Sequence, residues 1–153
     1  MKILVVCLGN ICRSPLGEAI LQQKAKEHGL NWQVDSAGTN GFHTGEPPHS
    51  MSQKVAALNG LDISGQRSRK FISEDFFRYD KIYAMANDVL YDMKRIGGPT
   101  FDDSKAELFL DQLLPGRNMD VPDPWSGPEE GYHDVFKLID QAAEAIVHSY
   151  IVQ

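Results

Sequence analysis

The chain of 153 residues contains only two cysteines, Cys7 and Cys12. Two cysteines close together near one end are too few for the disulfide framework of a small secreted protein. No apolar run approaches the roughly 18 residues that a membrane-spanning helix needs, and no segment has the form of a signal peptide. We therefore expect a cytoplasmic protein with reduced thiols and no membrane insertion.

Positive charge is also scarce. The chain has 15 Lys and Arg against 21 Asp and Glu, for a formal net charge of −6. This balance argues against a nucleic-acid partner. We interpret the one basic cluster, residues 67–70, as a solvated loop rather than a docking site for an acidic peptide.

The composition is that of an ordinary globular protein, with 42% hydrophobic and 24% charged residues. The length suits one domain, residues 1–153. Strand and helix patterns alternate, which predicts an α/β fold: a single three-layer domain whose four-stranded parallel sheet is flanked by helices. We expect strands over 2–7, 32–35 (at an edge), 81–85 and 107–110, and helices over 14–28, 49–59 and 87–95. A last helix is indicated by apolar residues at helical spacing: Tyr132, Val135, Phe136, Ile139, Ala143, Ile146 and Tyr150.

The most informative segment is the stretch CLGNICRS, residues 7–14. It follows an apolar strand and precedes a helix for which Ser14 is the expected N-cap and Pro15 the first residue. The thiol of Cys7 and the guanidinium of Arg13 thus end a strand-to-helix turn, where backbone N–H groups and the helix N-terminus attract anions. This predicts a phosphate-binding loop after the first strand, with a nucleophile at its floor.

Other residues of the loop suit the same chemistry. The planar fork of Arg13 matches two phosphate oxygens, and Gly9 lets the backbone approach the ligand. Asn10 tolerates left-handed geometry, and the Ser14 hydroxyl can donate to the sulfur. Surroundings of this kind favour the thiolate, the form that acts as a nucleophile. The rest of the predicted loop consists of Leu8, Ile11 and Cys12.

A nucleophile at phosphorus also needs an acid for the leaving oxygen. Asp123 is the candidate, because Pro122 and Pro124 restrict the backbone on both sides of it. A carboxyl beside a bound dianion favours its protonated form. Without the loop at residues 7–14, we would interpret this segment as an ordinary turn.

These motifs resemble those of the low-molecular-weight protein tyrosine phosphatases, and the likeness covers nearly the whole chain. The resemblance implies that Cys7 is the nucleophile that becomes a phosphocysteine and that Arg13 binds the phosphoryl group. Asp123 would donate a proton and later act as a base on water. Asn10, Ser14 and Ser36 match the family's network that supports the loop. The matching segments are 6–15, 35–39, 45–48, 62–65 and 121–124.

Four positions depart from the usual pattern of that family. Phe42 stands where Trp is common on the wall of the cleft, and Trp125 where Tyr usually follows Asp-Pro. Both are aromatic, so we expect a slot for a phenyl ring between them. Gln66 replaces a loop-supporting His of some members, and Ala86 stands where Asp is common. The last two put the stiffness of the residues behind the loop in question.

The predicted reaction is the hydrolysis of phosphotyrosine, whose length suits a thiol at the bottom of a deep cleft. We expect no metal and no cofactor, because backbone amides and Arg13 supply the positive charge and the five histidines lack metal-site spacing. We assign the histidines surface or loop roles. The resemblance implies phosphotyrosine-containing proteins as partners, with a tyrosine kinase among them in bacterial relatives.

Several alternatives stay open at this point. A phosphoarginine phosphatase of the same fold carries Thr where this chain has Ile11. An arsenate reductase needs further cysteines, and none follows Cys12. A phosphocarrier or phosphopeptide reader would not need Asp123. After oxidation of Cys7, Cys12 could capture the sulfenic acid in a disulfide, or it could merely pack under the loop.

Overall fold

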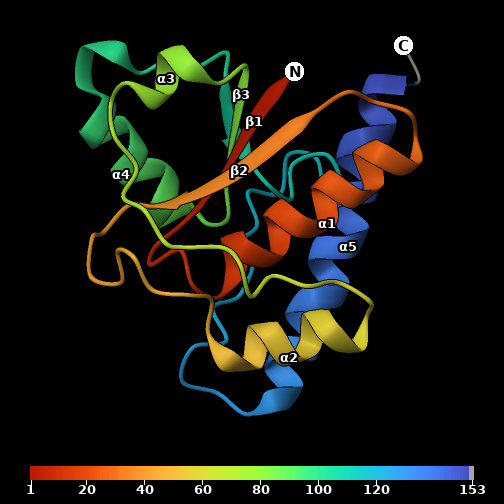
Figure 1. Ribbon diagram of the computed structural model, residues 1–153. Helices are drawn as coiled ribbons and strands as arrows, with labels where there is room; N and C mark the ends of the chain where they lie inside the picture. The colour runs from red at the N-terminus through yellow and green to blue at the C-terminus, as the bar shows by residue number, and fades with distance from the viewer. Residues whose placement is uncertain (152–153) are drawn as a thin grey trace.

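Four parallel strands form one sheet in the order β2-β1-β3-β4 in the computed structural model, which describes residues 1–151 (Figure 1). Five consecutive residues of the first strand are buried, because it lies inside the sheet and both of its faces are covered. The predicted four-stranded parallel α/β fold is confirmed. The strands are β1 (Lys2–Cys7), β2 (Gln33–Gly38), β3 (Lys81–Ala84) and β4 (Ala106–Leu108).

Helices cover both faces of the sheet, as Figure 1 shows. Alternate side chains of β1 separate into two cores, because successive residues of a strand point to opposite faces. Ile3 and Val5 pack with α1 and α5, whereas Leu4 and Val6 pack with α3 and α4. The three predicted layers are therefore present. The helices are α1 (Arg13–Glu27), α2 (Ser50–Leu58), α3 (Asp75–Arg78), α4 (Asn87–Gly97), the 3₁₀ turn η1 (Gly98–Thr100) and α5 (Glu129–Ile151).

The apolar stripe of the last helix is core, as predicted. Tyr132, Ile139, Ala143 and Ile146 are at most 1% exposed and face the layer formed by α1. Burial along one face explains why a helix with several charged residues is stable in this position.

Some element boundaries differ from the expectation. Ser14 is not an N-cap, because α1 begins at Arg13 and no side chain caps it. β2 extends three residues further than predicted, to Gly38, because it pairs with β1 along its whole length. α4 includes Gly97 and ends where Gly98 has φ of 51°. The short helix α3 was not predicted.

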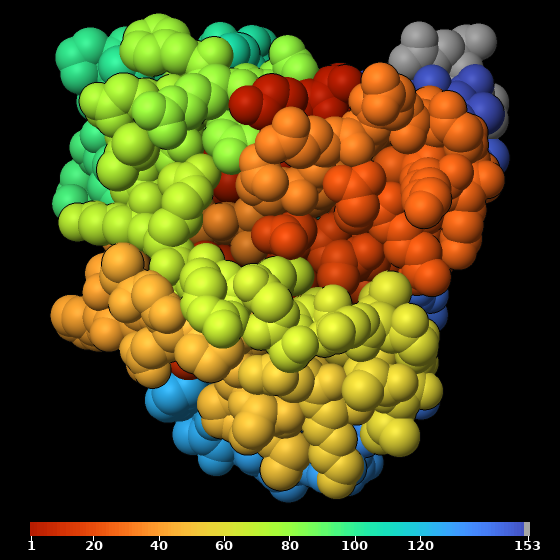
Figure 2. Space-filling model, viewed as in Figure 1, coloured from red at the N-terminus to blue at the C-terminus, as the bar shows by residue number. Residues whose placement is uncertain are grey.

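The segment that follows α2 crosses one face of the molecule. Figure 2 shows residues 61–75 (yellow to green) running beside α2 and the loop 39–48 (orange). The interpretation of residues 67–70 as a solvated loop is wrong for two of them, since Ser68 is buried and Arg69 is half-buried and paired with Asp75. The need to satisfy the buried Asp75 carboxylate explains this placement.

The sheet places the predicted loop at the carboxyl ends of its strands, where ligands bind in open α/β sheets. Cys7 ends β1 opposite Gly38, which ends β2. A Cβ atom on Gly38 would lie 2.9 Å from the carbonyl oxygen of Leu8, so only glycine fits here. None of the helices in residues 1–151 is long and apolar enough to cross a membrane.

Candidate active site

Residues 7–14, called the thiol loop below, turn their carbonyl oxygens outward. Five of these oxygens accept hydrogen bonds from groups outside the loop, at 2.8–3.1 Å. The amide N–H groups of Leu8, Gly9, Ile11 and Cys12 have no acceptor among residues 1–151. A loop held by its carbonyls presents its N–H groups on the other side, which is a cradle for an anion. The pairs, donor first, are Thr39 N with Cys7, Asn40 N with Leu8, Ser68 Oγ with Gly9, His49 N with Ile11 and Ser52 Oγ with Cys12.

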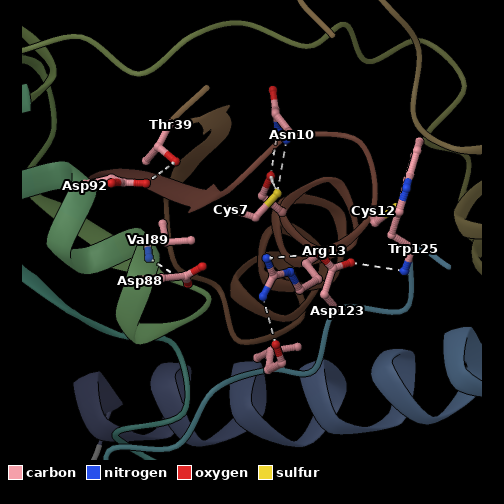
Figure 3. A network of polar contacts seen from close by, with 12 residues as sticks. Cys7, Asn10, Cys12, Arg13, Thr39, Asp88, Val89, Asp92, Asp123 and Trp125 are labelled. Carbon is pink, nitrogen blue, oxygen red and sulfur yellow. Dashed lines mark hydrogen bonds and ion pairs between the residues drawn. The ribbon is translucent and has the colours of Figure 1, made fainter. Parts of the chain in front are cut away.

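The side chain of Cys7 lies within this loop, with its sulfur towards Asn10 (Figure 3), and Cys7 is almost fully buried. The Ser14 hydroxyl is 3.0 Å from Sγ, and the backbone N–H of Asn10 donates to Sγ over 3.2 Å. Asn10 has φ of 58°, the left-handed conformation expected from its residue type. The sulfur thus has one backbone N–H and one hydroxyl within hydrogen-bond distance.

A chain of hydrogen bonds continues behind the sulfur. The side-chain amide of Asn10 donates to the hydroxyls of Ser14 (2.7 Å) and Ser36 (3.0 Å), and Ser36 donates to Glu18 over 2.8 Å. Burial raises the pKa of Glu18 to about 7, and the nearby charge of Asp35 also raises it, while the Ser36 hydrogen bond opposes the change. The structure thus brings Asn10, Ser14 and Ser36 together as one network.

Arg13 begins α1 and points into the site from the opposite end of the loop (Figure 3). Arg13 is only 5% exposed; its guanidinium donates to the carbonyl oxygen of Val121 over 3.0 Å and lies 3.7 Å from the carboxylate of Asp123. The backbone of Val121 also donates to Met85, which follows β3. These contacts hold the guanidinium in one position beside the anion-binding face of the thiol loop.

Asp123 lies on the loop that precedes α5. Its side chain is 45% exposed, and one carboxylate oxygen accepts the backbone N–H of Trp125 over 3.1 Å. The other oxygen faces Arg13. The carboxyl therefore borders both the guanidinium and solvent, a place from which it could exchange protons with a ligand.

A cleft of about 240 Å³ opens above the thiol loop. Nine of the predicted residues line it, while Asn10, Ser14 and Ser36 lie behind it. Asn40 and His43 also line the cleft and were not predicted to do so, because no motif marks them. The nine predicted lining residues are Cys7, Leu8, Gly9, Ile11, Cys12, Arg13, Phe42, Asp123 and Trp125.

Two aromatic side chains form the rim. Phe42 is 86% exposed, and Trp125 is about half exposed. Trp125 contacts the imidazoles of His43 and His49, with ring centroids 5.4 and 5.3 Å apart. His43 does lie in a loop, as expected, and His49 caps the helix that follows it; both also pack against the rim of the cleft, which was not expected.

Cys12 lies beneath the loop, with Sγ 3.8 Å from the hydroxyl of Tyr132. Burial raises the pKa of Cys12 to about 12, with the nearby Cys7 and Asp123 adding to the change and Tyr132 and Arg13 opposing it. At neutral pH this thiol is protonated, which distinguishes it chemically from a nucleophile.

Gln66 and Ala86, the two residues behind the thiol loop that differ from the family pattern described above, have different consequences. Gln66 donates to the carbonyl oxygen of Pro15 over 3.1 Å, so it still contacts the start of α1. Its own side-chain oxygen is buried without a partner among the described residues. Ala86 is buried at the N-terminus of α4 and provides no side-chain cap. In residues 1–151, no group of three or more His, Cys, Asp or Glu side chains could hold a metal ion.

Residues 2–151 match the family model of the low molecular weight phosphotyrosine protein phosphatases. The chain belongs to this family. It is 33% identical to the low molecular weight protein-tyrosine-phosphatase YfkJ of Bacillus subtilis over 151 residues, which is 97% of this chain and 95% of that protein. The family is one of phosphatases, so the chain is a phosphoric monoester hydrolase.

Solved structures of similar proteins share its fold. A protein tyrosine phosphatase from Entamoeba histolytica is 35% identical, with a TM-score of 0.89 over 99% of this chain and 97% of that one. Wzb of Vibrio vulnificus, solved with benzylphosphonate, is 32% identical, with a TM-score of 0.86 over 97% of both chains. Both proteins agree with the present chain in the arrangement of the sheet and helices.

Proposed function

We propose that this phosphatase hydrolyses phosphotyrosine in proteins, with Cys7 as nucleophile, Arg13 as phosphate ligand and Asp123 as general acid and base. One observation carries the proposal. The Cys7 sulfur lies beneath a ring of backbone N–H groups, with a guanidinium and a carboxyl at the mouth of the same cleft. A nucleophile, an oxyanion site and a proton donor are what phosphoryl transfer requires.

The reaction takes two steps. The Cys7 thiolate attacks phosphorus, so an S–P bond forms while the bond from phosphorus to the phenol oxygen breaks, and Asp123 gives its proton to that oxygen. Water then attacks phosphorus as Asp123 takes a proton from it. The S–P bond breaks, inorganic phosphate leaves, and the thiolate is restored.

The depth of the site supports an aromatic substrate. The sulfur is buried at the floor, and Phe42 and Trp125 stand at the exposed rim, where a phenyl ring can lie against them. A phosphoserine would bring its backbone against the rim before its phosphate reached the loop. Wzb was solved with benzylphosphonate, a phosphonate attached to a benzyl group, which agrees with this choice.

The alternatives to phosphotyrosine receive less support. Ile11 is buried, lines the cleft and has no hydroxyl to offer a phosphoarginine or its attacking water. The chain has no cysteine beyond Cys7 and Cys12 to pass electrons to arsenate. We infer that the partners are phosphotyrosine-containing proteins, with a tyrosine kinase among them, in a reducing cytoplasm.

The experiment compares kcat/KM on three peptides of one sequence that differ only in the phosphorylated residue: tyrosine, serine or arginine. We expect turnover of the phosphotyrosyl peptide at a rate at least tenfold above the others. Cys7→Ser should bind that peptide without turning it over. Equal rates on all three peptides would refute the specificity, and full activity of Cys7→Ser would refute the nucleophile.

A further inference from the structure

Residues 68–71, called the brace below, touch the thiol loop from the side away from the cleft. The Ser68 hydroxyl donates to the carbonyl oxygen of Gly9, and the backbone N–H of Arg69 donates to the side-chain oxygen of Asn10, each over 3.1 Å. We propose that the brace, clamped by the ion pair of Arg69 with Asp75, sets the direction of the hydrogen bonds that reach the Cys7 sulfur. Arg69 and Asp75 are then positioning residues for the reaction proposed above, on which this inference rests.

The direction of these hydrogen bonds follows from which groups can only donate. A backbone N–H can only donate, so the N–H of Arg69 requires the oxygen of the Asn10 amide to face it. The nitrogen of that amide must then face the other way, where it supplies its two hydrogens to Ser14 and Ser36. One hydrogen bond from the brace thus fixes the orientation of Asn10.

The orientation of Asn10 also determines whether the Ser14 hydroxyl donates to the Cys7 sulfur. Because the Ser14 hydroxyl already accepts a hydrogen from Asn10, its own hydrogen is directed to Cys7 Sγ, 3.0 Å away. A reversed Asn10 amide would accept the Ser14 hydrogen instead. The sulfur would then keep only the backbone N–H of Asn10 as a donor. The brace therefore decides whether a thiolate receives one or two hydrogen bonds from these residues.

The clamp that holds the brace is an ion pair whose carboxylate is buried and whose guanidinium is partly exposed. The Asp75 carboxylate is fully buried, and its two oxygens accept both ends of the Arg69 guanidinium at 3.0 Å. The backbone N–H of Ile72 donates to the same carboxylate over 2.9 Å. The Tyr79 hydroxyl also accepts from Arg69 and donates to Asp35. Such a pair is costly to break from one side, because it leaves a desolvated charge behind.

The brace is also tied to the end of β2. Gly38 donates to the carbonyl oxygen of Arg69 over 2.9 Å and accepts from the N–H of Phe71 over 2.7 Å. Neither Arg69 nor Asp75 lines the cleft. An effect of these side chains on the thiol must therefore travel through the backbone of the brace and through Asn10.

The test replaces each half of the clamp, with Asp75→Asn and Arg69→Lys. The rate of inactivation by iodoacetate is measured from pH 5 to pH 9, together with kcat and KM on p-nitrophenyl phosphate. We expect the inactivation profile to move towards higher pH and kcat to fall about tenfold, the effect of losing one hydrogen bond to the thiolate. KM should change little, because the residues that line the cleft are intact.

Thr100→Val is the matched control. Its hydroxyl donates to the carbonyl oxygens of Ser73 and Gly97 beside the same short helix, so the variant loses local stability without altering the clamp. It should lower Tm and leave the iodoacetate profile in place. If the two clamp variants lower Tm with the same unchanged profile, the clamp is merely structural and the proposal is wrong.

The variant Asn10→Asp tests the direction of the hydrogen bond between Ser14 and the Cys7 sulfur. An aspartate of the same shape offers only acceptors, so it diverts the Ser14 hydrogen from the sulfur and should reproduce the shift of the profile. Adding Asp75→Asn to this variant should then shift the profile little further, because both changes act on one chain of hydrogen bonds. Additive shifts would overturn the proposal. Alkylation does not depend on turnover, so this result stands apart from a failure of the proposed hydrolysis.

Discussion

The Arg13 guanidinium and the Asp123 carboxylate lie 3.7 Å apart, although they come from opposite ends of the chain. Both groups border the same cleft. A phosphate dianion in the loop would compete with Asp123 for Arg13, because the guanidinium fork matches two phosphate oxygens. Binding of substrate would then release the carboxyl from its cation and leave it beside the leaving oxygen of the substrate.

Asp123→Asn should therefore separate catalysis from binding. We expect kcat on p-nitrophenyl phosphate to fall by roughly 10²–10⁴, as for the loss of a positioned acid. Inorganic phosphate should inhibit the variant at least as tightly as the parent, because its competitor for Arg13 is gone. Asp120→Asn, which changes a neighbouring carboxylate that contacts Asn87, serves as the control and should keep the parental rate. Weaker inhibition by phosphate would contradict this account.

The two cysteines should differ sharply in reactivity. Burial raises the pKa of Cys12 to about 12, so its thiol is un-ionised at pH 7. We expect iodoacetamide to alkylate Cys7 alone in the folded protein, with phosphate giving protection, and both cysteines after unfolding in urea. Peptide mass spectrometry measures the two sites separately. Equal labelling of both in the folded protein would show that Cys12 is not shielded.

Glu18 should make the protein less stable as pH rises. Its pKa is raised from 4.5 to about 7, chiefly by burial, so the folded chain keeps a proton that the unfolded chain has already lost. The free energy of unfolding should then fall as pH rises through this interval. Glu18→Gln should abolish the fall and add on the order of 1–3 kcal/mol above pH 7. Urea denaturation at pH 5 and pH 8 measures it.

Glu27→Gln, at the exposed end of the same helix, is the control for that experiment. It should leave the difference between the two pH values as it is in the parent. A Glu18→Gln variant with an unchanged pH dependence would mean that Glu18 ionises in the folded protein as it does in the unfolded chain.

Gly38→Ala should damage the site through the backbone. The added Cβ would lie 2.9–3.0 Å from backbone atoms of Leu8, Gly9 and Asn10, none of which can move like the end of a side chain. We expect a loss of roughly 1–3 kcal/mol in stability, as for overpacking, and a larger relative fall in kcat than in Tm. Gly65→Ala, where a Cβ meets no atom within 4 Å, should be neutral in both measurements.

Local sequence patterns were sufficient for the fold and for the groups proposed to react. The buried run of β1, the helix that follows it and the periodicity of α5 depend on neighbours in sequence, so they were predicted to within a few residues. Cys7 and Arg13 share one turn, and two prolines mark Asp123. Ser14 was misassigned as a cap because the sequence does not say whether its hydroxyl accepts from the N–H groups of the helix or joins the hydrogen bonds between Asn10 and the Cys7 sulfur.

Long-range contacts decided the rest. From the sequence, Arg69 was interpreted as a charge in a solvated loop, and only the structure shows its ion pair with the buried Asp75. The sequence also did not indicate that His43 and His49 pack against Trp125. By itself, the sequence determined which chemical groups the loop contains and that a strand and a helix hold them. Only the tertiary structure decided which way each hydrogen bond at the sulfur points, because a donor's direction depends on partners brought together from distant parts of the chain.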